Sequence, residues 1–82
     1  MNIVPVSTIA QTARFEADRL KSQRLLEAGW MLESVAEDFA AGRATATELK
    51  AASYDLMDAL PEESDLTTSE VIAAVRMALV AR

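Results

Sequence analysis

Hydrophobic positions near the C-terminal end of the chain follow no single helical stripe. Residues 71–82 read VIAAVRMALVAR, and only Arg76 and Arg82 have side chains that prefer water. A surface helix normally has one apolar stripe and a polar back, so a helix that is apolar on nearly every side must be surrounded by protein. We therefore expect this helix to lie inside a bundle or against another chain.

Start and stop signals divide the chain into three predicted helices. Capping patterns of the type Thr-x-x-Glu/Gln mark three starts, at Thr8–Gln11, Thr45–Glu48 and Thr67–Glu70. Gly42 suits the left-handed position after a helix, and Pro61 disfavours helix at the residue before it. We expect a single domain over 1–82, with an extended arm over 1–7 and helices near 8–41, 46–60 and 68–82.

The second predicted helix has a clear one-sided pattern. Its apolar or small face consists of Leu49, Ala52, Ser53, Leu56 and Leu60. Most charged residues of the segment fall elsewhere, which is typical of a helix that packs on one side only.

The first predicted helix has two apolar faces. The face through Ile9 and Leu20 and the face through Leu25 and Phe39 differ by roughly 80° at ~100° per residue. Gly29 lies at the change, and because glycine costs about 1 kcal/mol relative to alanine inside a helix, we expect a kink or a break there. We favour a kink because no capping residue follows.

The length of this first helix constrains the architecture. A straight helix over 8–41 would be about 50 Å long, which exceeds the size of a compact domain of this length. Either the chain bends at Gly29 to make a four-helix bundle, or the long helix pairs with a second copy. We favour the homodimer, because it also covers the apolar last helix.

Composition favours an all-α fold. Of 82 residues, 51% are hydrophobic, but only two are glycine and two are proline, too few for the turns of an all-β chain. A chain this short has a marginal core of its own. We predict a small helical bundle of three helices, with the first kinked or broken near Gly29, completed by dimerisation.

The chain contains neither cysteine nor histidine. This composition excludes disulfides, thiol chemistry, the usual zinc sites and catalysis by imidazole. Glu33, Glu37 and Asp38 have a spacing that could bind a divalent ion, but such groups usually keep a helix face solvated. We therefore expect no enzyme activity, no metal and no cofactor. The chain shows no signal peptide and no apolar run long enough for a membrane span, so we expect a cytoplasmic location and no membrane partner.

The net charge of -5 is unevenly distributed. The range 27–70 contains eleven acidic and two basic residues, whereas each end of the chain is slightly basic. The negative electrostatic potential of this acidic range opposes phosphate binding. We therefore expect no direct nucleic-acid contact and favour a basic protein as partner. The acidic partner surface that we predict comprises Glu33, Glu37, Asp38, Glu62, Glu63 and Asp65.

Two apolar groups are candidates for a protein interface. Phe15, Leu26 and Trp30 lie opposite the main stripe of the first helix and would contact a partner unless the arm or the last helix covers them. The complete predicted interface comprises Phe15, Leu26, Trp30, Val71, Ile72, Met77 and Val80. Arg76, a lone cation on the last helix, should reach a carboxylate such as Glu33, Glu37 or Asp55.

The acidic loop over 61–65 could bind calcium or imitate a nucleic-acid backbone. It lacks the EF-hand pattern, and its charge suits the positive end of the helix that follows. We therefore interpret the loop as local structure.

These observations predict a small acidic regulator or inhibitor that binds another protein and occludes it. Adaptors, antitoxin-like proteins and phage-encoded inhibitors are examples of this class. Two alternatives stay open: a dimeric helix-turn-helix-like nucleic-acid regulator, and a DNA mimic that blocks a nucleic-acid-binding protein.

Overall fold

The computed structural model describes residues 4–81, so residues 1–3 of the predicted arm and Arg82 lie outside the described residues. The described chain is helical, with α1 (Val6–Leu20), α2 (Gln23–Ala40), α3 (Ala46–Ala59) and α4 (Thr68–Ala81). The all-α class is confirmed. The count of three helices is not, because the expected helix over 8–41 is divided into α1 and α2.

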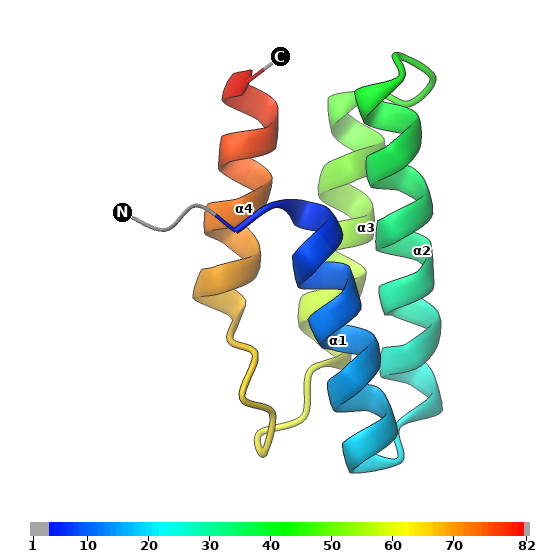
Figure 1. Cartoon of the computed structure of the whole chain (residues 1–82), viewed down its shortest axis with the longest axis vertical. Coiled ribbons are helices and arrows are strands. Elements are labelled where there is room, and N and C mark those ends of the chain that lie inside the picture. The colour runs from blue at the N-terminus through cyan, green and yellow to red at the C-terminus, as the bar shows by residue number, and fades with distance from the viewer. Residues whose placement is uncertain (1–3, 82) are drawn as a thin grey trace.

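Each helix runs antiparallel to the one before it (Figure 1). α1 and α3 each pack against both α2 and α4, and the buried residues form one hydrophobic core. The radius of gyration is 11.7 Å, which agrees with the value of about 12 Å for a compact chain of this length. The chain therefore avoids a 50 Å rod by folding into a four-helix bundle.

The break between α1 and α2 falls at Lys21 and Ser22, not at Gly29. Lys21 has the left-handed conformation, with φ 57° and ψ 42°. The backbone N–H of Ser22 donates to the carbonyl oxygen of Ala17 at 2.9 Å, which closes α1. The Ser22 hydroxyl then accepts a hydrogen bond from the Leu25 N–H at 3.2 Å and caps α2.

Gly29 lies inside α2, where this helix approaches α1 closely. A Cβ atom at position 29 would lie 3.1 Å from Cγ of Arg14 and 3.4 Å from the carbonyl oxygen of Ala10. The first distance is shorter than an ordinary van der Waals contact, so any side chain here would press on α1. The glycine therefore permits close helix packing and does not mark a bend.

Local signals define the ends of the middle helices. Gly42 follows α2 with a φ of 80°. Thr45 and Glu48 form a reciprocal capping box at the start of α3. This helix ends at Ala59, ahead of Pro61.

The outer helices begin differently from each other. α4 has the expected box, in which the hydroxyl of Thr67 accepts from the Glu70 N–H and the Glu70 carboxylate accepts from the Thr67 N–H. Thr8, in contrast, lies inside α1 and does not start it. Pro5 occupies the extended capping position, and its carbonyl oxygen accepts the Ile9 N–H at 3.1 Å.

The core is built mainly from leucine and other aliphatic residues. The largest fully buried side chains in it are Ile9, Leu25, Leu32, Leu49, Leu56 and Val71. α4 is less enclosed than its sequence indicates, because Ile72, Met77 and Val80 are exposed. Part of this apolar helix therefore stays at the surface of one chain.

Candidate functional site

A half-exposed tryptophan on the outer side of α1 and α2 is the main candidate site. The side chain of Trp30 is 55% exposed, and the guanidinium carbon of Arg14 lies 4.2 Å from the centre of its ring. Arg14 Nη2 also donates to Glu33 Oε2 at 2.8 Å. The ion pair holds the guanidinium while its flat face covers the indole, an arrangement that suits cation–π attraction.

The fold brings this group together through helix geometry. Trp30 and Glu33 are three residues apart and therefore share one side of α2. Gly29 leaves room for the stem of Arg14, because a Cβ at position 29 would meet Arg14 Cγ. We call Arg14, Trp30 and Glu33 the Trp30 patch. Leu26, which we also predicted at this interface, is half-buried and packs against the core. Phe15, which we predicted beside Trp30, is 69% exposed on α1, but no contact joins the two rings among the described interactions.

The guanidinium of Arg14 is only partly satisfied. Its Nε atom is buried and has no hydrogen-bond partner within residues 4–81. An unpaired buried donor carries a desolvation cost. Packing and the ion pair with Glu33 hold the side chain of Arg14. The Trp30 ring that lies against its guanidinium is therefore held in place as well.

A second candidate site is an apolar groove between α1, α2 and α4. It has a volume of about 610 Å³ and is open to solvent. The start of α1, the end of α2, Leu49 and the second half of α4 form its walls. From α4 the wall includes Met77 and Ala81, and from α2 it includes Glu37, the one charged residue in the lining that the structure describes. This groove was not predicted, because it depends on how three helix ends meet.

The predicted acidic surface is divided between the two ends of the bundle. Glu37 and Asp38 are near the end of α2, whereas the loop with Glu62, Glu63 and Asp65 joins α3 to α4 at the opposite end (Figure 1). Three of these carboxylates have partners within the chain. Asp38 pairs with Arg43 at 3.1 Å, Glu33 pairs with Arg14, and Asp65 lies 3.8 Å from Arg19.

The predicted interface residues of α4 also separate. Val71 is fully buried in the core and does not reach the surface. Ile72, Met77 and Val80 are exposed, and so is Arg76. The expected ion pair from Arg76 to Glu33, Glu37 or Asp55 is not formed among the described residues.

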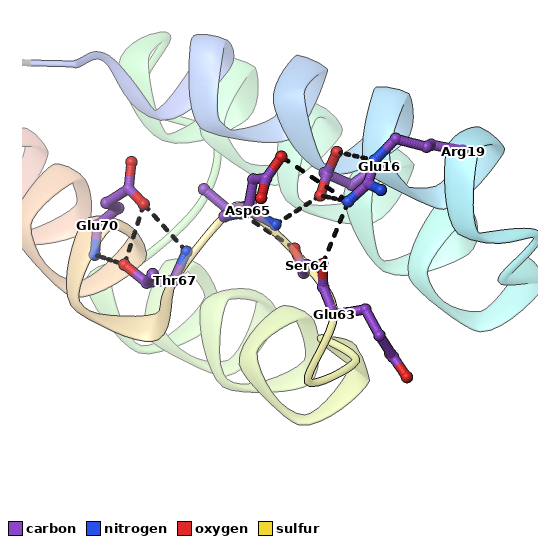
Figure 2. Close-up of polar contacts among 8 residues, drawn as sticks. Glu16, Arg19, Glu63, Ser64, Asp65, Thr67 and Glu70 are labelled. Carbon is purple, nitrogen blue, oxygen red and sulfur yellow. Dashed lines mark hydrogen bonds and ion pairs between the residues drawn. The ribbon is translucent and has the colours of Figure 1, made fainter.

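Glu16 is a buried acid that we did not predict (Figure 2). Its carboxylate accepts two hydrogen bonds from Arg19, at 2.8 and 2.9 Å, and one from the Asp65 N–H at 2.6 Å. The Arg19 contacts, followed by that of Asp65, lower the pKa of Glu16 to about 2, although burial opposes this change. The position of Glu16 on the stripe of Ala13 and Ala17 was the available signal.

Arg19 extends the same network into the loop before α4. Its Nη2 atom donates to the carbonyl oxygen of Glu63 at 3.2 Å and lies 3.8 Å from Asp65 Oδ2. The pairing with Glu16 raises the pKa of Arg19. As Figure 2 shows, Glu16 and Arg19 point from α1 into this acidic loop, so the Asp65 carboxylate and the Glu63 carbonyl oxygen serve local structure.

The described residues offer neither a metal site nor a membrane-spanning helix. Within residues 4–81, no group of three or more potential ligands could hold a metal ion, and no helix is both long and apolar enough to cross a membrane. Comparisons with protein-family models, curated proteins and solved structures find no match for this chain.

Proposed function

We propose that this protein is a small regulator or inhibitor that binds another protein through the Trp30 patch and occludes part of it. The observation that carries the proposal is the exposed indole of Trp30, held under Arg14 by the ion pair to Glu33. Tryptophan and arginine are the residues most enriched at the energetic centres of interfaces. A contact group that is already ordered loses less side-chain entropy on binding.

The charges around Trp30 favour a partner with basic residues. Glu27 is exposed and lies about one turn from Trp30, whereas the charge of Glu33 is already paired with Arg14, so the free charge beside the indole is negative. Carboxylates at the rim of an apolar contact steer an oppositely charged protein towards it and repel a like-charged one. The proposed partner therefore places an apolar side chain on Trp30 and lysine or arginine residues around it.

The nucleic-acid alternatives gain no support from this surface. Arg14, Arg19, Arg24 and Arg43 each pair with a carboxylate of the chain. Cations engaged in this way are not free for phosphates. DNA mimicry would need a continuous row of free carboxylates, whereas Glu33, Asp38 and Asp58 are each paired with an arginine of the chain.

A crosslinking experiment tests the proposal. A photoreactive amino acid replaces Trp30 in one variant and Tyr54 in another, because Tyr54 is an exposed aromatic residue on α3. We expect position 30 alone to give a specific adduct with a cellular protein. Binding of that protein, once purified, should then be weakened by Trp30→Ala and retained by Tyr54→Ala. No adduct at position 30, or equal effects of both substitutions, would refute the proposed contact.

A further inference from the structure

A second apolar surface lies on α4, away from the Trp30 patch. The exposed residues Ile72, Met77 and Val80, together with Arg76, make up what we call the α4 face. Met77 also lines the 610 Å³ groove, so the α4 face and the groove form one continuous apolar surface. Val80 is 78% exposed and continues the row of Ile72 and Arg76 at four-residue spacing along α4.

Two opposite charges on this surface have no partner in the described part of the chain. Arg76 lies one turn from both Ile72 and Val80 and is not paired with any carboxylate among residues 4–81. Glu37 lines the far wall of the groove, and no described cation pairs with it. The α4 face therefore presents a cation, and the groove presents an anion.

We propose that this surface binds a second copy of the same chain. In a two-fold symmetric dimer the same patch contacts itself, so each residue pair forms twice. Arg76 of one copy would pair with Glu37 of the other, and Val80 of each copy would enter the groove of its partner. A second copy fits this surface because the surface is complementary to itself. It carries Val80 and the groove that would receive it, and it carries both Arg76 and Glu37.

A stable dimer interface buries about 800 Å² per partner, or roughly one sixth of the 5214 Å² surface of this chain. The three exposed apolar side chains of α4 are too few for that area, so the proposed contact also uses the groove walls that α1 and α2 supply. This contact uses residues separate from the Trp30 patch, so it goes beyond the proposed function.

Charge reversal tests the dimer. Sedimentation equilibrium measures the dimer dissociation constant of the full chain, with circular dichroism to show that each variant is folded. We expect a reversible dimer for the wild type and at least a tenfold weaker dimer for Arg76→Glu and for Glu37→Arg, because each substitution opposes like charges twice. The double variant Arg76→Glu/Glu37→Arg should recover dimerisation, since the pair is restored with its signs exchanged.

Two matched variants control for net charge. Lys50→Glu and Asp55→Arg make the same charge changes at exposed positions on α3 and should leave the dissociation constant within about threefold of wild type. A monomeric wild type up to about 300 µM, or a double variant no tighter than the single ones, would overturn the proposal. Trp30→Ala should leave the dimer intact, which separates this test from that of partner binding.

Discussion

Glu16 is the residue whose environment departs most from its ordinary one. Its side chain is 3% exposed and joins α1 to the loop before α4 through Arg19 and the Asp65 N–H. A buried carboxylate is tolerated only when hydrogen bonds replace its water, and here three do so. The ionised form of Glu16 is therefore part of the folded structure.

Acid should weaken the fold through Glu16. The pKa of this carboxyl is about 2 in the folded protein and 4.5 ordinarily, so its ionised form stabilises the fold fully above pH 4.5, and that contribution is lost as the pH falls towards 2. Melting temperatures between about pH 2 and pH 5 should decline less steeply for Glu16→Gln than for wild type. The exposed Glu27→Gln should follow the wild type. Parallel curves for wild type and Glu16→Gln would show that Glu16 is not the responsible group.

Trp30 should matter for binding more than for stability. Removal of an anchoring indole costs about 2 kcal/mol or more of binding free energy. The side chain is 55% exposed, so we expect Trp30→Ala to change the free energy of unfolding by less than about 1 kcal/mol. Calorimetric titration of the partner and urea unfolding measure the two quantities. Strong destabilisation with unaltered affinity would assign Trp30 to the fold alone.

The junction of α1 and α2 carries local strain. Lys21 has the left-handed conformation that glycine adopts without a steric penalty. We predict that Lys21→Gly stabilises the protein by up to about 1 kcal/mol, measured by urea unfolding. Lys50→Gly, in the middle of α3, should instead destabilise it by about 1 kcal/mol. Loss of stability in Lys21→Gly would mean that the lysine side chain contributes more than the strain costs.

The contact between α1 and α2 depends on Gly29. Because a Cβ there already meets Arg14 Cγ at 3.1 Å, Gly29→Val should destabilise the protein by about 1–3 kcal/mol. The displaced Arg14 should also leave the indole, which would shift the fluorescence of the single tryptophan. A variant as stable as wild type with an unchanged spectrum would show that the helices do not pack this closely.

Structural features that depend on residues close in the sequence could be predicted from the sequence. Features that depend on contacts between helices could not. The capping boxes at Thr45 and Thr67 each involve residues three apart, so the sequence alone predicts them. The break at Lys21 was missed because the left-handed residue there is a lysine and not a glycine, and because the Ser22 cap is followed by Leu25 where a capping box would have Glu or Gln. At Gly29 the sequence indicated a bend, but the close approach of α1 is the reason for the glycine.

The candidate site was likewise predictable only in part from the sequence. Helical periodicity placed Trp30 opposite the main stripe, and it is exposed in the structure. The stacking of Arg14 on Trp30 depends on how two helices pack, and periodicity within one helix carries no such information. Val71 was assigned to an interface because all of α4 is apolar, yet packing against α1 and α3 buries it within one chain.

The whole molecule presents two separate surfaces for which we propose a role. The Trp30 patch involves α1 and α2, and the groove lies between the start of α1, the end of α2 and the second half of α4. In the two proposals, the groove surface binds a second copy and the Trp30 patch binds a basic partner protein. The central claim is that the Trp30 patch stays free for that partner.

Acrylamide quenching of tryptophan fluorescence tests this claim most directly, because the chain contains one tryptophan. The quenching constant is measured from low to high chain concentration, and again after the crosslinked partner has been purified and added. We predict that it stays constant as the chain self-associates and falls when the partner binds. Protection of Trp30 by self-association alone, or none by the partner, would contradict the assignment of this patch to partner binding.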